Sequence, residues 1–339
     1  MRREVLILNL FSFIYISIFS FFIAYYALDY KPRNDLKIYG LYFECINSNF
    51  HFSCSDIIGS SGEIFFYLFS FLFSLVSPDY SFFLFYYSVF ILSSVLFWVI
   101  SLCKGNGFFC TITALFFLFT DFRYYDLSSN VLRHGLACSM MLMFIYFFIK
   151  QGGNKTVGFL STLPLLSHLS SVGHFFLFLK SEILNSKFFW LFVFFVSYFF
   201  SEIFFNSFLN GSGDSYIYRK LIFYSQNASG ESGGIVFPLH YALVVILSLV
   251  INVEDRNYLV VRKVLFVYVA LILLFIPLGM SYRFVSFIMP LCAICFSFQI
   301  NFITKKIHSS TVSIFLYTLV SLFFIVLFFK NYYFIMKAF

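Results

Sequence analysis

The stretch YSFFLFYYSVFILSSVLFWVISL, residues 80–102, decides the fold class, because it is long, apolar and free of charged side chains. A helix needs about 20 such residues to cross the hydrocarbon core of a bilayer, which is roughly 30 Å thick. Comparable apolar runs recur along all 339 residues, and 61% of the chain is hydrophobic. A soluble domain is closer to half apolar. The sequence therefore predicts an integral membrane protein and excludes a water-soluble fold.

The expected architecture is an all-α polytopic bundle with about 10–11 transmembrane helices in a single domain over residues 1–339. A GT-C-like arrangement is one form that such a bundle could take. One pair of segments, at 156–168 and 169–180, is expected to be broken, because Pro164 and a polar cluster at His168 interrupt it. The other runs that predict crossings are 5–28, 107–121, 131–149, 187–205, 235–253, 263–281, 283–300 and 310–329.

Residues 63–77 have the pattern of an amphipathic helix that lies at the outer membrane interface. Polar side chains recur there at helical spacing and share one face, namely Glu63, Tyr67, Ser70, Ser74 and Ser77. If this helix does not cross, the cytoplasmic side carries 12 of the 22 Lys and Arg residues but only four of the 15 acidic ones. That distribution obeys the positive-inside rule. It leaves two outer loops, at 29–62 and 206–234.

Ionisable side chains in or near a bilayer are costly, so each is a candidate for function. Arg133 and Arg283 each begin an apolar run, and His168 marks the turn of the broken pair. The expected topology places all three at the outer boundary of the membrane. Guanidinium groups bind phosphate oxygens in a two-pronged fork, so the three residues predict a site for a phosphate-bearing substrate. The alternatives are snorkelling of each arginine and a buried structural role for His168.

The outer loops carry further candidates. Arg219 and Lys220 lie among tyrosines in the loop at 206–234, where they could bind substrate. Any of the outer acids could supply base catalysis or bind a metal, but most are expected to be solvated. These acids are Asp35, Glu63, Asp121, Asp126 and Asp214. Cys45 and Cys54 share the other loop and could form a disulfide if it is periplasmic. Basic residues elsewhere stand at the ends of apolar runs, which indicates membrane orientation and not nucleic-acid binding. Motifs for ATP binding, zinc proteolysis and serine esterases are absent from the sequence, and no cofactor or metal is expected.

Four short motifs spread over residues 29–300 carry a family resemblance. They are Arg33-Asn34-Asp35 followed by Tyr39, SNVLRHGLA at 129–137, SHLS at 167–170, and Arg283-Phe284. In these motifs the chain resembles the EpsG-like and Wzy-type O-antigen polymerases of bacterial polysaccharide loci. His134 departs from the family pattern, which commonly has Gln after this arginine.

The resemblance implies a glycosyltransferase of lipopolysaccharide biosynthesis in the bacterial inner membrane. Such an enzyme moves a growing glycan from its undecaprenyl pyrophosphate carrier to an incoming lipid-linked repeat unit at the periplasmic face. Arg133 and Arg283 would then hold the leaving pyrophosphate, and His168 would deprotonate or orient the acceptor hydroxyl. Asp35 and Tyr39 would contribute to substrate binding. The implied partners are lipid-linked glycans, the bilayer and a chain-length regulator protein.

Three other classes of membrane protein compete with this interpretation. A sugar-decorating acyltransferase would have His and Arg near its first helix, and residues 5–28 contain neither. A flippase for lipid-linked sugars would place charges near the bilayer midplane between repeated halves, whereas the candidates here gather at one boundary. An O-antigen ligase would have much the same sequence features, and a larger outer loop would distinguish it.

Overall fold

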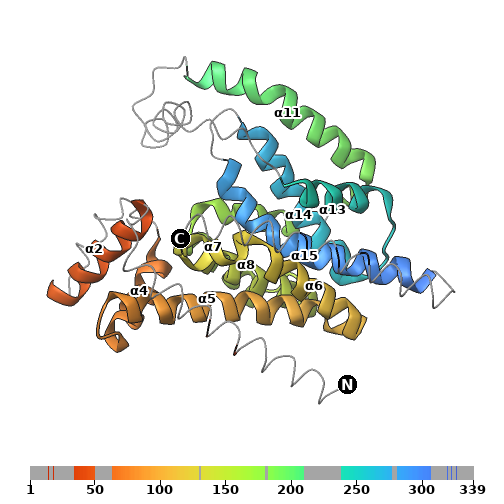
Figure 1. Cartoon of the computed structure of the whole chain (residues 1–339). Coiled ribbons are helices and arrows are strands. Elements are labelled where there is room, and N and C mark those ends of the chain that lie inside the picture. Colours follow the sequence, from red (N-terminus) through yellow and green to blue (C-terminus); the bar gives the residue numbers. More distant parts are fainter. Residues whose placement is uncertain are drawn as a thin grey trace.

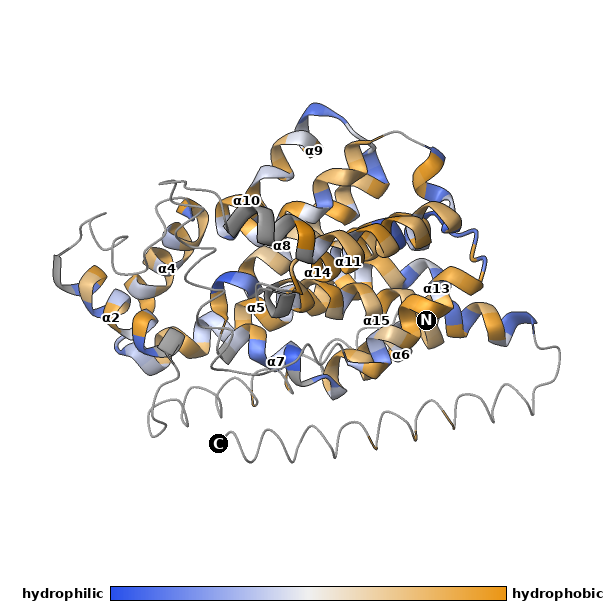
Figure 2. Ribbon diagram, turned by 90° about the horizontal axis from the view of Figure 1, so that it is seen from above, coloured by the Kyte–Doolittle hydropathy of each residue, from blue (hydrophilic) through white to orange (hydrophobic). Residues whose placement is uncertain are grey.

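The computed structural model is helical throughout the residues that it describes, which are 34–49, 63–129, 131–179, 182–209, 238–276 and 281–306, with the single positions 14, 18, 319, 322 and 326. Helices pack around α15 (Ser281–Lys306), as Figure 1 shows. Apolar residues cover most of the long helices, whereas α2 (Asn34–Asn49) and α7 (Phe122–Ser129) carry many hydrophilic residues (Figure 2). The predicted all-α polytopic membrane class is confirmed.

Four described helices are long and apolar enough to cross a membrane: α5 (Tyr80–Cys103), α8 (Leu132–Gln151), α14 (Arg256–Leu274) and α15. Asp79 and Asp255 fix the starts of α5 and α14, because each carboxylate accepts two backbone N–H bonds from the first turn. The most apolar part of α15 is 83% buried, compared with 56% for α5 and α14. α15 is therefore the central helix, while α5 and α14 each leave one side exposed, where it can contact lipid.

Two runs that were predicted as crossings form helices of only about two-thirds of the required length. α6 (Phe108–Thr120) has 13 residues and α13 (Leu239–Val250) has 12, so each is about 20 Å long at 1.5 Å per residue. Both pack against α15. α6 is followed by a short helix, α7 (Phe122–Ser129). Helices this short end within the bundle, where their terminal polar groups need partners.

The broken pair predicted at 156–180 is confirmed, and the break lies at His168. α9 (Lys155–Leu160) and α10 (Thr162–Ser167) precede it, and a 3-10 helix, η3 (Leu169–Phe178), follows. His168 has extended backbone, with φ −165° and ψ 131°, and so interrupts the helical path. η3 packs against α8 and α14. The chain then continues through η4 (Glu182–Asn185) into α11 (Lys187–Leu209).

The amphipathic stretch forms α4 (Ile64–Val76), and its polar face points into the protein. Tyr67, Ser70 and Ser74 are buried, whereas Leu68 and Leu72 are exposed. Exposed leucines suit contact with acyl chains, which are equally apolar. The position of α4 at the membrane surface remains a prediction. The stretch at 29–62, expected as a loop, contains a further helix, α2 (Asn34–Asn49), which packs against α4 and α5.

Candidate functional site

Arg133 lies in the first turn of α8 and is the cation of a polar cluster shared with α2 and α4. Its Nη1 donates to Glu63 Oε2 over 2.9 Å in a salt bridge. Its Nε donates to the hydroxyl of Tyr39 over 3.4 Å. Glu63 stands directly before α4, and Tyr39 is in α2. The Arg133 side chain is 17% exposed and that of Glu63 9%, so the pair is largely buried while the guanidinium keeps some access.

His168 faces the same carboxylate from the break between α10 and η3. Its Nε2 lies 3.7 Å from Glu63 Oε1. Its Nδ1 accepts the backbone N–H of Ser170 over 3.1 Å and lies 2.5 Å from the Ser170 hydroxyl. An imidazole nitrogen that accepts an N–H carries no proton, so this network assigns the proton of the neutral ring to Nε2, on the side of Glu63. Since its Nδ1 lone pair is occupied, His168 is arranged to orient a neighbour more than to take up a proton.

His134 stacks on His168. The two ring centroids are 3.9 Å apart with an interplanar angle of 32°. His134 is buried, and the ring of Phe287 lies 6.1 Å from it. The residue that departs from the family pattern therefore lies in the middle of the cluster, where it supports the imidazole of His168.

Gly135 fixes the position of the cluster within the bundle, because α8 passes too close to its neighbours for a side chain. A Cβ atom there would lie 2.8 Å from Ile91 Cγ2 and would collide with the carbonyl oxygen of Leu127. Ser88 donates to the Ser128 carbonyl over 3.0 Å at a similar level. Along α5, Ser88 and Ile91 lie about 12 and 17 Å from its first residue, Tyr80. The position of Arg133 at the outer boundary of the membrane remains a prediction.

A second buried polar cluster joins α6, α7 and α13. Asp121 Oδ2 lies 3.0 Å from His240 Nε2 and accepts the hydroxyl of Tyr241. Asp121 Oδ1 accepts the backbone N–H of Arg123 over 2.9 Å. The guanidinium of Arg123 lies over the Tyr241 ring, 5.6 Å from its centroid. One carboxylate therefore caps the start of α7 and joins it to two side chains of α13.

The structure brings three of the sequence-predicted residues, Arg133, His168 and Tyr39, into one cluster. Arg283 lies in the first turn of α15, one helical turn before Phe287, and its side chain lies outside the described residues. The same holds for the side chain of Asp35, which is in the first turn of α2. Arg219 and Lys220 lie entirely outside the described ranges.

Two acids organise these clusters. Glu63 and Asp121 were among the outer acids that could supply base catalysis or bind a metal, although most such acids were expected to be solvated. Both are buried, at 7% and 3% exposure. The signal for Glu63 was present, because it begins the polar face of α4. Asp121 carries no comparable local signal. Across the described part of the chain, no group of three or more His, Cys, Asp or Glu side chains could hold a metal ion.

α2 adds two chemical features near Tyr39. Cys45 is disulfide-bonded, and the partner considered from the sequence, Cys54, lies outside the described residues. Disulfide bonds persist in oxidising compartments. Burial, with a contribution from the phenol of Tyr67, raises the pKa of Tyr42 well above its ordinary value. The phenol of Tyr42 is therefore neutral at physiological pH.

The comparison with protein families covers almost the entire molecule. The family model of the EpsG family matches residues 12–337. This range contains every described helix and both polar clusters. No curated protein and no solved structure matches the chain. The chain therefore belongs to the EpsG family, as a transmembrane protein with a polysaccharide polymerase-like function.

Proposed function

We propose that the protein joins oligosaccharide repeat units carried on undecaprenyl pyrophosphate into O-antigen or a similar surface polysaccharide. The observation that carries this proposal is the pairing of Arg133 with Glu63 beside His168. A partly accessible guanidinium suits the pyrophosphate of a lipid carrier, because it forms charge-assisted hydrogen bonds to phosphate oxygens. The EpsG family match supports the same class of reaction.

The reaction breaks the bond between the anomeric carbon of the growing glycan and its pyrophosphate oxygen. It forms a bond from that carbon to a hydroxyl oxygen of the incoming repeat unit. Undecaprenyl pyrophosphate leaves, and the hydroxyl proton must be accepted by a base. Arg133, with Arg283, neutralises the charge that develops on the leaving pyrophosphate. The acceptor unit keeps its own carrier, so the polymer remains lipid-linked.

We assign the base to Glu63. In the structure its carboxylate is paired with Arg133, and an arriving pyrophosphate competes for that guanidinium. Once Arg133 turns to the substrate, the Glu63 carboxylate is available to accept the proton of the acceptor hydroxyl. The Nε2–H of His168 is positioned to hold this carboxylate or the acceptor oxygen in place. The hydroxyl of Tyr39 accepts a second hydrogen bond from Arg133, through its Nε.

The proposal places this chemistry at the periplasmic face of the bacterial inner membrane. The distribution of basic residues favours that orientation. The disulfide at Cys45, in the helix that carries Tyr39, suits an oxidising compartment. A separate chain-length regulator protein is the expected partner, together with lipid-linked glycans and the bilayer.

The test is a gel of surface glycan from cells in which the gene is deleted. We expect glycan of a single repeat unit, and restoration of the polymer ladder by the wild-type gene but not by Arg133→Ala or Arg283→Ala. Arg256→Ala, at the first residue of α14, is the control and should restore the ladder. Loss of all surface repeat units with lipid-linked units trapped inside would indicate a flippase. Polymer that forms but remains on its lipid carrier would indicate a ligase, and an intact ladder lacking acyl groups an acyltransferase.

A further inference from the structure

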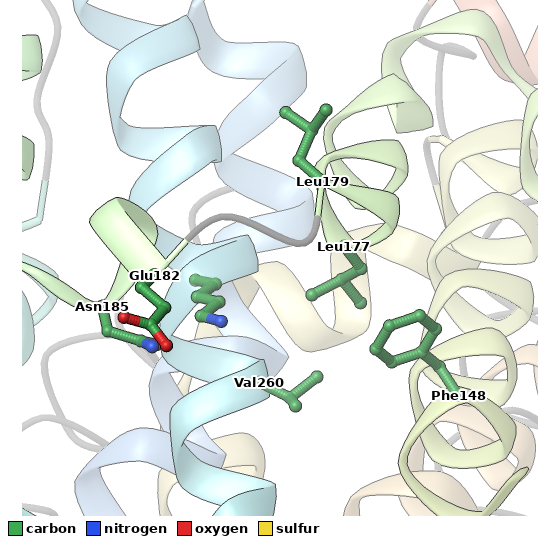
Figure 3. Close-up of a pocket in the computed structure, with 7 residues that line it drawn as sticks. Phe148, Leu177, Leu179, Glu182, Asn185 and Val260 are labelled. Carbon is green, nitrogen blue, oxygen red and sulfur yellow. The ribbon is translucent and has the colours of Figure 1, made fainter. Parts of the chain in front are cut away.

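A pocket of about 260 Å³ lies far from the Arg133 cluster and is lined by residues of α8 and α14, by the C-terminal end of η3 and by η4. In Figure 3, Glu182 and Asn185 lie on one side of it and Phe148 on the other. Phe148 is 15 residues beyond Arg133 in α8, which corresponds to about 20 Å along the helix. The basic residues at this end of the bundle assign it to the cytoplasmic side.

Two opposite charges line this pocket without pairing. Lys263 of α14 and Glu182 of η4 are both lining residues. Within the described ranges neither side chain forms a salt bridge or a hydrogen bond. An ammonium and a carboxylate that share a pocket but leave each other unpaired can each take a ligand group of opposite charge.

The neighbouring cations are already engaged. Lys187 donates to the carbonyl of Val250 over 2.9 Å. Arg262 donates to the carbonyl of Asn185 over 3.3 Å, and its guanidinium lies over the rings of Tyr258 and Phe266. Among the described residues, Lys263 is therefore the cation that this pocket offers to a ligand, and Arg262 and Lys187 add positive potential near it.

The rest of the lining is apolar and open to the surroundings. Phe148, Leu177, Leu179 and Val260 line the pocket, and Leu179 is 54% exposed. Apolar walls beside two charges suit an amphiphile whose headgroup carries a phosphate and an ammonium. A free zwitterion would gain nothing from these walls, whereas a phospholipid would lay the start of its acyl chains along them.

We infer that this pocket binds the headgroup of phosphatidylethanolamine from the cytoplasmic leaflet. The lipid phosphate accepts from Lys263, and the primary ammonium of the lipid donates to Glu182 and Asn185. Phosphatidylcholine has the same charges but a methylated nitrogen that cannot donate, and phosphatidylglycerol has a phosphate without an ammonium. This site is independent of the proposed polymerase reaction.

The experiment titrates dioleoyl phosphatidylethanolamine into the full chain, purified in detergent and stripped of lipid, and counts bound lipid by native mass spectrometry. We expect it to bind about fivefold to tenfold more tightly than the phosphatidylcholine of equal chain length. Lys263→Gln and Glu182→Gln should each lower the affinity by a similar factor. Lys150→Gln is the matched control, because it removes an exposed cation from the last turn of α8, near Phe148, that does not line the pocket.

A charge exchange keeps the proposal falsifiable if a single variant folds poorly. The double variant Glu182→Lys, Lys263→Glu retains one charge of each sign and should recover most of the phosphatidylethanolamine affinity with the headgroup reversed. Equal binding of the two zwitterionic lipids would overturn the inference. Tighter binding of phosphatidylglycerol, increased further by Glu182→Gln, would overturn it in favour of a general anionic site. Melting temperatures of the lipid-free variants identify any loss of folding.

Discussion

The cluster around Glu63 and the cluster around Asp121 both bury an acid against basic side chains, but they are built differently. Glu63 forms a salt bridge with the side chain of Arg133, and the side chain of His168 lies further away at 3.7 Å. Asp121 is held by the backbone N–H of Arg123 at the start of α7, and by the phenol and the imidazole of two side chains of α13. Partners of the first kind can be exchanged for a ligand. The backbone N–H of the second cluster cannot be given up without uncapping the start of α7.

This difference indicates which cluster acts on substrate and which supports the fold. A carboxylate that caps a helix loses backbone hydrogen bonds when it moves, and buried donors left unpaired cost about 1–3 kcal/mol each. A carboxylate paired with a partly exposed guanidinium can be released when a phosphate replaces it. We therefore assign the Glu63 cluster to the reaction and the Asp121 cluster to the packing of the short helices α6, α7 and α13.

The largest expected effect is that of Glu63→Gln on the rate of polymer formation. The amide cannot accept the acceptor proton as a carboxylate does, so we expect the rate to fall by about 10²- to 10³-fold. The assay uses purified protein and lipid-linked repeat units. Glu44→Gln, an exposed acid of α2, is the control and should keep the wild-type rate. A Glu63→Gln protein with full activity would remove Glu63 from the mechanism.

A substitution in the Asp121 cluster should lower the stability of the fold. Asp121→Ala leaves the backbone N–H of Arg123 and the side chains of His240 and Tyr241 without their acceptor, at a cost of about 3 kcal/mol. We expect a fall in melting temperature on the order of 5 °C. Asp79→Ala removes an exposed helix cap of α5, and the expected cost is smaller, about 1 kcal/mol. Equal melting temperatures for the two variants would contradict the structural role of Asp121.

The smallest effect is expected at Ser170. Ser170→Ala removes the hydroxyl beside His168 Nδ1 but keeps the backbone N–H that this nitrogen accepts. The ring should therefore hold its proton on Nε2, and the polymerisation rate should change by less than about threefold. Thr162→Ala, an exposed position of α10, serves as the reference. A loss as large as that of Glu63→Gln would show that the hydroxyl, and not the backbone, sets the state of His168.

The sequence predicted those parts of the fold that depend on local pattern. The uncharged run at 80–102 became α5, and Pro164 with the polar residues at His168 marked the break. That α6 and α13 are too short to cross was not predictable, because hydropathy does not show that Asp121 will pair with His240, 119 residues away in sequence. The pairing of Glu63 with Arg133, which is 70 residues distant, was hidden for the same reason. The polar face of α4 was recognised from the sequence, but hydropathy alone does not say whether a polar face contacts water or protein.

The most direct test of the central claim is the polymerisation rate of purified Arg133→Ala per folded molecule, measured beside its melting temperature. Loss of one preorganised donor to the leaving group typically costs 10²- to 10³-fold, and we predict a loss of about this size per folded molecule. The melting temperature should also fall, because the buried carboxylate of Glu63 loses its ion pair. Arg133→Lys should retain part of the rate, because it keeps the charge but not the fork. An Arg133→Ala protein that polymerises at the wild-type rate would contradict the account.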